Sequence, residues 1–305
     1  MDRFDALQAF ARVVETGSFT KAARALELSN ATVSQLVQQL EARLRVKLLH
    51  RTTRQVRVTV DGAAYYERVV RLLADLEAAD ASLADATGAL QGRLRVDVPS
   101  PLARLVLVPA LGGFHARFPD LELHLGASDR RVDVIGDDVD CVLRGGDLPD
   151  STLVARRVGT LAMGIYAAPA YVEQLGRPEH PLDLAADPHR TVGYLRWRSG
   201  SVAPLTLTRG AETVALQGRQ WLAVDDGNAY LAAGLAGLGA LGLPRYMADP
   251  HVGRGELVPL LEDWSLEAMP LYVAYPPNRH VSARLRSFID WVGELLARQP
   301  AIATV

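Results

Sequence analysis

The stretch FTKAARALELSNATVSQLVQQLEARL, residues 19–44, decides the fold of the N-terminal part of the chain. Ser18 precedes it and can cap a short helix over residues 19–26. A tight connection follows, and Ser29 or Asn30 can cap a longer helix that runs to about Leu44. The apolar residues of this longer helix fall within one stripe: Val33, Leu36, Val37, Leu40 and Leu44. The spacing therefore predicts two helices joined by a short turn.

The opposite face of the longer helix is small and polar and carries no carboxylate. It presents Ala31, Ser34, Gln35, Gln38 and Ala42. Glutamine can bond adenine through two hydrogen bonds in the major groove, and small residues let a helix approach the bases closely. A plain solvated surface, which is the alternative, would more often carry Glu and Lys. The pattern therefore favours contact between this face and DNA bases.

Two further segments complete the head, which we define as residues 1–60. Apolar positions spaced three and four apart predict an amphipathic helix over residues 4–16, which Gly17 ends. Short apolar runs at residues 46–49 and 56–59 flank a polar tip. Two such runs around a polar tip are typical of a β-hairpin, or wing.

The head is basic although the whole chain is not. The chain has 305 residues and a net charge of −2, but its first 60 residues carry a balance of +5, which leaves −7 on the rest. A basic head on an acidic body indicates contact with a polyanion, and chance segregation of charge is the alternative. At the wing tip, Arg51, Thr52 and Arg54 can contact phosphates, which position a protein on DNA without reading its sequence. A solvated tip is the alternative there.

The composition excludes several classes of protein. With 49% apolar and 22% charged residues, the chain is neither disordered, nor collagen-like, nor a disulfide scaffold. The single cysteine, Cys141, fits a reducing compartment and excludes a zinc site of several thiolates. No segment offers the roughly 20 apolar residues that a membrane span needs, and acids stand near Met1 where a signal peptide is basic. We expect a cytoplasmic protein with no membrane partner.

Residues 61–86 predict one long helix after the head. Its apolar residues recur at helical spacing: Tyr66, Val69, Val70, Leu73, Leu76 and Leu83. A helix of about 25 residues spans roughly 37 Å, and its stripe can hardly be buried within a head of this size. We therefore predict a dimerisation helix, with packing against its own chain as the alternative. Glycines at positions 88 and 92 end it in a hinge.

The rest of the chain alternates between strands and helices. Strands are expected at residues 94–98, 121–125, 139–143, 161–167 and 271–275, and helices at residues 101–118, 228–237 and 282–298. This alternation favours an α/β body with parallel strands. The pattern G-x-G-x-x-G at residues 237–242 does not lie between a strand and a helix, so it does not predict dinucleotide binding. The histidines lack metal-ligand spacing and no nucleophile motif occurs, so we expect no enzyme, metal or cofactor.

Several motifs run without a gap through the head: FTKAA at residues 19–23, LSNATVS at 28–34 and RTTR at 51–54. In the body, GRLRV stands at residues 92–96, DCVLRGG at 140–146 and LYVAYP at 271–276. Together they make the chain closely similar to the LysR-type transcriptional regulators over essentially its whole length. Three residues depart from the family's common pattern: Ala31 stands for proline, Gln35 for arginine and Arg45 for glycine.

The resemblance implies an α+β head (winged helix-turn-helix) with a long linker helix, then an α/β two-lobed periplasmic-binding-protein-like effector domain. The implied boundaries are 1–60 for the head, 61–91 for the linker helix and hinge, and 92–305 for the effector domain. Lobe 1 would be about 92–161 and 267–305, and lobe 2 about 162–266. A small molecule in the cleft would change how the heads sit on a promoter. The alternatives are a cytosolic α/β enzyme or solute-binding protein with an incidental basic head, and an architectural DNA binder without an effector.

The candidate site residues follow from the polar helix face, the wing and the resemblance. For DNA they are Thr20, Lys21, Asn30, Ala31, Ser34, Gln35, Gln38, Arg51, Thr52 and Arg54. For the effector they are Ser100, Ser128, Arg144, Trp197 and Asp226. Arginine in the cleft would favour an anionic effector, unless Arg144 pairs with a nearby acid, and Trp197 has simple packing as its alternative. The expected partners are double-stranded promoter DNA, the effector, further copies of the chain in a homodimer or homotetramer, and RNA polymerase.

Overall fold

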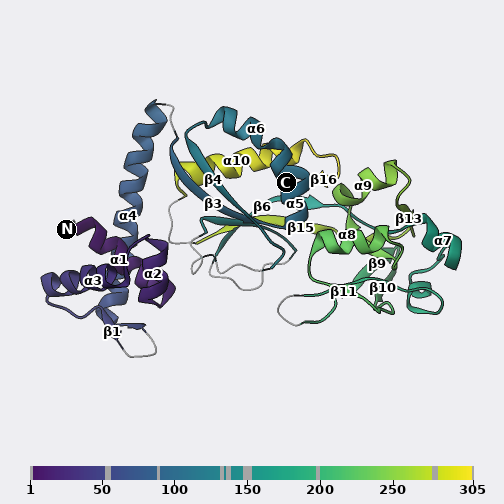
Figure 1. The fold of residues 1–305 in the computed structure, drawn as a ribbon, viewed down its shortest axis with the longest axis horizontal. Coiled ribbons are helices and arrows are strands. Elements are labelled where there is room, and N and C mark those ends of the chain that lie inside the picture. Colours follow the sequence, from purple (N-terminus) through teal and green to yellow (C-terminus); the bar gives the residue numbers. More distant parts are fainter. Residues whose placement is uncertain are drawn as a thin grey trace.

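The computed structural model describes residues 3–51, 56–87, 90–130, 134, 139–146, 153–196, 200–276 and 281–303. Figure 1 shows three parts in a row: the head, a central sheet with its helices, and a second α/β unit that carries α7, α8 and α9. Helix α4 rises from the head beside the central part. The mixed α/β architecture is the one that the sequence predicts.

The head is a winged helix-turn-helix. Its elements are α1 (Arg3–Thr16), α2 (Phe19–Ala25), α3 (Asn30–Leu44), β1 (Leu49–Arg51) and β2 (Val56–Val58). The two predicted caps are confirmed, because Ser18 Oγ accepts a hydrogen bond from Lys21 N at 3.3 Å and Ser29 Oγ accepts one from Thr32 N at 3.1 Å. Strands β1 and β2 pair antiparallel and form the base of the wing.

The apolar stripes of the three helices meet in one core. Phe10 and Val13 of α1 pack with Val33, Leu36 and Val37 of α3, and all five are fully buried. Helix α3 ends at Arg45, which adopts the left-handed conformation with φ 56°. An arginine therefore takes the backbone conformation that glycine adopts at lowest cost, and the helix ends where the sequence predicts.

Helix α4 (Val60–Thr87) has 28 residues, which span about 42 Å. Its first turns join the head core through Tyr65, Tyr66, Val69, Val70 and Leu73. The expectation that the head cannot bury this stripe is therefore wrong for the N-terminal half of the helix, because α4 lies directly against α1. Leu72 and Leu76 point elsewhere and are 56% and 41% exposed. The side chain of Leu83 lies outside the described part of the chain.

Lobe 1 is built on a six-stranded sheet in the order β16-β6-β15-β5-β3-β4. The bounds are β3 (Gly92–Val98), β4 (Leu121–Ala127), β5 (Cys141–Gly145), β6 (Val154–Leu161), β15 (Met269–Tyr275) and β16 (Ile302–Ala303). Strand β3 runs parallel to β4 and β5, but β15 and β6 pair antiparallel. The expectation of parallel strands is thus correct for only half of this sheet, because β15 enters it after the chain has returned from lobe 2.

The helices of lobe 1 are α5 (Ser100–Leu102), a π-helical turn (Ala103–Leu107), α6 (Val108–Arg117) and α10 (Ala283–Ala297). Phe114 of α6 packs against Phe288 and Trp291 of α10, with ring centroids 5.9 and 4.9 Å away. These rings cover the apolar face of the sheet, where Leu94 and Val96 are buried. Because side chains alternate along a strand, the polar residues Arg93, Arg95 and Asp97 lie on the opposite face of β3.

Lobe 2 consists of short elements that the sequence pattern largely misses. Its strands are β7 (Met163–Ala167), β8 (Gly193–Tyr194), β9 (Leu205–Arg209), β10 (Glu212–Leu216), β11 (Ala223–Val224), β12 (Leu241–Pro244), β13 (Val258–Leu260) and β14 (Ser265–Leu266). Its helices are α7 (Pro169–Leu175), a 3₁₀ turn (Pro181–Ala185), α8 (Gly227–Leu235) and α9 (Arg245–Gly253). The strand expected at residues 161–167 is two strands, because β6 ends at Leu161 and β7 begins at Met163 in another sheet.

Two crossovers connect the lobes. The first is Ala162, whose N–H donates to Ala301 O at 3.3 Å and whose carbonyl accepts from Arg245 N at 2.8 Å. The second lies between β14 and β15, at residues 267–268. Helix α8 contacts α5, so the face of lobe 2 that carries α8 is the face turned toward lobe 1 (Figure 1).

Among the described residues, no helix has the length and apolar character needed to cross a membrane. The same part of the chain contains no group of three or more His, Cys, Asp or Glu placed to hold a metal ion.

Candidate functional site

The first candidate site is the outer face of α3. Asn30, Ala31, Gln35 and Gln38 are exposed on it, and Ser34 is half-buried. Thr20 and Lys21, at the start of α2, are exposed beside it. The Asn30 amide donates to Thr20 Oγ1 at 3.0 Å, so the N-termini of α2 and α3 are held together. The structure therefore brings these predicted DNA-binding residues onto one surface.

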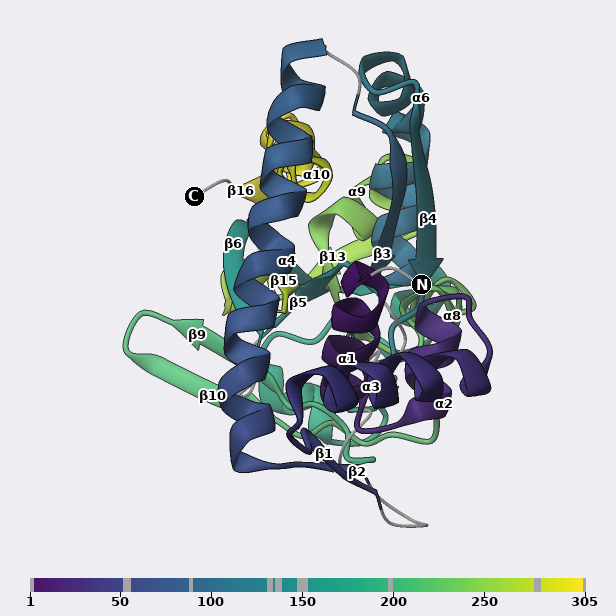
Figure 2. The ribbon, with the colours of Figure 1, turned by 90° about the vertical axis from the view of Figure 1, so that its left-hand side faces the viewer.

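The wing stands next to this surface (Figure 2). Arg51 is the last residue of β1, opposite Val56 of β2, and its side chain is outside the described part of the chain. Thr52 and Arg54 lie outside the described residues altogether. The antiparallel pairing of β1 with β2 confirms the predicted strands of the wing, and the predicted tip at residues 52–55 lies outside the described residues.

Sequence reasoning missed the residue that holds the wing in place. Glu41 is only 4% exposed and extends the buried row of Val33 and Val37 by one more turn. Its Oε1 accepts hydrogen bonds from Leu48 N at 2.9 Å and Leu49 N at 3.1 Å, and its Oε2 accepts one from Lys47 Nζ at 2.8 Å. Burial acts to raise the pKa of Glu41, but these hydrogen bonds outweigh it, so the pKa lies below its ordinary value. The signal in the sequence is a carboxylate at a position that continues the apolar stripe of α3, where an apolar side chain is expected.

The head also touches lobe 1. Glu27, in the turn between α2 and α3, pairs with Arg93 at 2.7 Å and with Arg95 at 3.5 Å, both from β3. The hydrogen bond and charge of Arg93 lower the pKa of the Glu27 carboxyl. Because all these groups are partly or largely exposed, salt screens the contact and it holds the head only loosely.

The second candidate site lies where α8 of lobe 2 meets lobe 1, and we call it the interlobe joint: Ser100, Asp129, Gly227 and Asn228. Asp129 Oδ1 accepts from Ser100 N at 2.9 Å, and its Oδ2 accepts from Gly227 N. The Asn228 amide donates to Ser100 Oγ at 2.7 Å. Burial raises the pKa of Asp129, although the hydrogen bonds from Gly227 and Ser100 act against this. Residues about 30 and 100 positions apart in sequence therefore meet at one point.

Three of the predicted effector residues, Ser100, Ser128 and Asp226, belong to this joint or are next in sequence to one of its residues. Ser100 belongs to it, Asp226 Oδ1 caps α8 by accepting from Ala229 N at 2.8 Å, and Ser128 Oγ accepts from Arg130 N at 3.1 Å. Trp197 lies outside the described residues. Arg144 pairs with Asp97 and also donates to Arg130 O at 3.1 Å.

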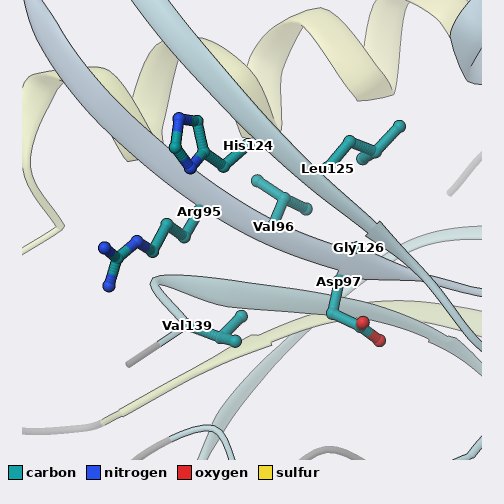
Figure 3. Close-up of a pocket in the computed structure, with 7 residues that line it drawn as sticks. All are labelled: Arg95, Val96, Asp97, His124, Leu125, Gly126 and Val139. Carbon is teal, nitrogen blue, oxygen red and sulfur yellow. The ribbon is translucent and has the colours of Figure 1, made fainter. Parts of the chain in front are cut away.

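This pairing is the alternative that the sequence left open for Arg144. The guanidinium already has a carboxylate partner, so the sequence-based reason for an anionic effector is weakened. Asp97 also borders an open hollow on the polar face of β3 and β4, together with Arg95 and His124, which are register partners (Figure 3). Gly126 leaves room for the Asp97 carboxylate, because a Cβ there would lie 2.5 Å from Asp97 Oδ2.

Comparison with known proteins decides the family. Residues 4–63 match the bacterial regulatory helix-turn-helix protein of the lysR family, and residues 87–297 match the LysR substrate binding domain. The chain is 39% identical to an HTH-type transcriptional repressor of Pseudomonas aeruginosa (strain UCBPP-PA14), over 99% of this chain and 95% of that protein. The chain belongs to the LysR-type transcriptional regulators.

Other transcriptional regulators agree in sequence or in fold. The transcriptional activator AaeR of Escherichia coli (strain K12) is 34% identical, over 95% of this chain and 93% of AaeR. The structure of CrgA from Neisseria meningitidis superposes with a TM-score of 0.61 at 32% identity, covering 95% of this chain and 97% of CrgA. Members of this family bind DNA and small-molecule effectors and form oligomers. This LysR-type chain is therefore a DNA-binding transcriptional regulator with an effector-binding domain, and not an enzyme.

Proposed function

We propose that this regulator reads its operator with the amide face of α3. The observation that carries the proposal is the position of Gln35 and Gln38, which are exposed on the side of α3 opposite its buried stripe. Ser34, Gln35 and Gln38 would contact bases, and Asn30 and Ala31 would lie at the groove where the helix enters. The small Ala31 leaves space for close approach.

The remaining candidates of the head would bind phosphates. Thr20 and Lys21 are exposed at the start of α2, where a positive helix end supports an anion. Arg51, Thr52 and Arg54 would contact the backbone from the wing. These contacts would position the head on DNA without selecting a sequence.

The domain boundaries remain the ones proposed from the sequence: 1–60, 61–91 and 92–305. Supporting them, β6 and β15 lie in one sheet whereas β7 and β14 lie in others, so the chain changes lobe near Ala162 and near residues 267–268. We propose the division of the effector domain into 92–161 with 267–305, and 162–266, and the two crossovers support it.

We infer that the effector binds between the lobes near Ser100, Ser128, Arg144, Trp197 and Asp226. A ligand there would have to exchange contacts with the interlobe joint, and it can shift the lobes only if it binds two arrangements with different affinity. An anionic effector would compete with Asp97 for Arg144. Bound effector would then alter the spacing of heads across a homodimer or homotetramer, and RNA polymerase at the promoter would be the further partner. Because the partner is promoter DNA, the place of action would be the cytoplasm.

Binding of the purified chain to the DNA that flanks its own gene tests the proposal, at about 0.15 M salt with excess competitor DNA. Protection of a two-fold symmetric site is expected. Salt-sensitive binding without sequence preference would favour an architectural protein instead. The solute-binding or enzymatic alternative would be favoured by two results together. The chain would not bind DNA, with or without metabolites from a cell extract, and a fragment covering residues 92–305 would keep the full ligand-binding or catalytic activity of the intact chain.

Replacing Gln35 by alanine is expected to relax base preference at one position of each half-site. A bidentate amide–adenine pair discriminates by about 1–3 kcal/mol, which is about 5- to 160-fold in relative affinity. Competition binding to operators with each base at each position measures this. Lys21→Ala is the matched control, because it should weaken all sequences alike and reduce the slope of affinity against salt. Unchanged base preference in Gln35→Ala would remove Gln35 as a reading residue.

Replacing Leu72 by glutamate is expected to raise the dissociation constant of the proposed dimer by at least about tenfold. The substitution places a charge on the apolar stripe of α4 that would pack against the partner helix. Leu72, Leu76, Ala79 and Leu83 recur at spacings of four and three, which is typical of a helix pair. Sedimentation equilibrium measures the dissociation constant. Val60→Glu is the control, since Val60 is 89% exposed at the start of the same helix. Equal dissociation constants for the two variants would show that this stripe does not carry the dimer.

A further inference from the structure

Contacts between the lobes converge on the first turn of α8. Gly227 and Asn228 contact Asp129 and Ser100 as described, and Asn228 Oδ1 also accepts from Arg104 at 3.2 Å. Just before the helix, Asp225 pairs with Arg130 at 3.4 Å. Each of these contacts joins a residue of lobe 1 to a residue of lobe 2.

Asp129 has a special place among them, because both of its carboxylate oxygens are used. One accepts the backbone N–H of Ser100 in lobe 1, and the other accepts the backbone N–H of Gly227 in lobe 2. Hydrogen bonds to a charged acceptor are about twice as strong as neutral ones. The α8 N-terminus adds a favourable dipole for the negative charge.

Two of the neighbouring contacts, Arg130 with Asp225 and Arg104 with Asn228, are weaker because they are exposed to solvent. The side chains of Arg130 and Asp225 are 63% and 41% exposed, and the Arg104 contact with Asn228 is exposed as well. Exposed pairs of this kind are screened by salt and contribute little. The part-buried polar contacts at the joint are the two hydrogen bonds of Asp129 and the Asn228–Ser100 hydrogen bond, and of these residues only Asp129 carries a charge.

The apolar packing at the joint is equally close. A Cβ on Gly227 would lie 2.5 Å from Pro101 Cγ and 3.1 Å from Asp129 Oδ2. Pro101 is buried and its ring is rigid, so any side chain at position 227 would force the two surfaces apart. Gly227 thus lets the N–H of α8 reach the Asp129 carboxylate.

We propose that Asp129 is the positioning residue that holds the two lobes in their resting arrangement by bridging the backbone N–H groups of Ser100 and Gly227. The role in regulation rests on the proposed function, because an effector between the lobes would act against this bridge. Two backbone N–H donors need two acceptor oxygens, which a carboxylate provides. Asparagine offers only one acceptor oxygen and would turn an N–H donor toward the second backbone N–H.

Hydrogen–deuterium exchange of the full chain tests the bridge directly, with neither DNA nor effector present. In Asp129→Asn, peptides covering residues 99–105 and 225–231 are expected to exchange at least about tenfold faster than in the wild-type protein, with head peptides unchanged. Asp225→Asn is the matched control, and it should leave both peptides close to wild type because its pair is exposed. Unchanged exchange in Asp129→Asn would overturn the proposal, and so would equal acceleration in the control.

A second variant keeps the proposal testable if Asp129→Asn does not fold. Gly227→Ala retains the carboxylate but pushes Pro101 away, so the same two peptides are expected to exchange faster while the head stays protected. Protection as in the wild type would contradict the bridge. Operator binding by the same variants, measured without effector, tests the regulatory role separately. An altered affinity for the operator supports that role. Faster exchange with an unaltered affinity would still support Asp129 as the bridge between the lobes, but it would overturn the link between the bridge and promoter binding.

Discussion

Replacing Glu41 by alanine is expected to lower the free energy of unfolding of the head by about 3 kcal/mol. The substitution removes the acceptor of two buried backbone N–H groups, those of Leu48 and Leu49, at the start of β1. An unsatisfied buried donor costs about 1–3 kcal/mol, and the alanine leaves no polar atom to replace the carboxylate. Lys47 adds little to this effect because its own side chain is 75% exposed.

Urea unfolding of the full chain, followed by circular dichroism of the head transition, measures the change. Gln39→Ala is the matched control, because Gln39 is exposed on the same helix and should unfold within about 0.5 kcal/mol of the wild-type protein. Operator affinity should fall with the stability of Glu41→Ala, because the wing loses its anchor to α3. A head that unfolds like that of Gln39→Ala would show that the wing is anchored in another way.

The same carboxylate predicts the direction of a pH effect. Its folded pKa lies below the ordinary value of 4.5, so its stabilisation is complete above that value and is lost as the pH falls through the folded pKa. The stability difference between wild type and Glu41→Gln should therefore be constant near neutral pH and shrink below about pH 4.5. Unfolding curves at pH 7 and pH 4 measure it, and a constant difference would rule out a charged Glu41 as the anchor.

The head could be predicted from sequence because its determinants are local. Ser18 and Ser29 cap helices three residues away, and the stripe of α3 repeats within one helix. The strands of the wing and the polar outer face of α3 follow from residues that are neighbours along the chain. An apolar stripe does not predict the role of Glu41, because a carboxylate is not an apolar residue, although its position continues the row of Val33 and Val37.

The body was harder because its determinants are distant in sequence. Strands such as β8, β11 and β14 have two residues each, too few for an alternating pattern to be recognised. Asp97 and Arg144 are 47 positions apart, and Asp129 and Gly227 are 98 apart, so no local pattern could pair them. The family resemblance pointed to Ser100 and Ser128, yet it did not reveal that Asp129 joins the lobes.

Replacing Gly62 by alanine is expected to destabilise the junction between head and linker by about 1–3 kcal/mol. A Cβ at this position would lie 2.1 Å from the carbonyl oxygen of Leu48 and 2.9 Å from its carbonyl carbon. That oxygen accepts hydrogen bonds from Thr59 N at 3.0 Å and Thr59 Oγ1 at 3.1 Å, so it cannot move without breaking the link between wing and α4. Gly62 N donates in turn to Thr59 Oγ1 at 2.9 Å.

The methyl group must therefore displace the backbone of α4 from the wing, which changes the direction in which the linker helix leaves the head. Because two heads on one operator depend on that direction, operator affinity should fall by at least about tenfold, beyond the loss of stability. Gly113→Ala in α6 is the matched control: nothing lies within 4 Å of its Cβ, and alanine there should stabilise its helix by about 0.5–1 kcal/mol. Thermal unfolding and operator titration of both variants separate the two effects. If Gly62→Ala matched the control in both measurements, the contact with Leu48 would not set the angle between head and linker.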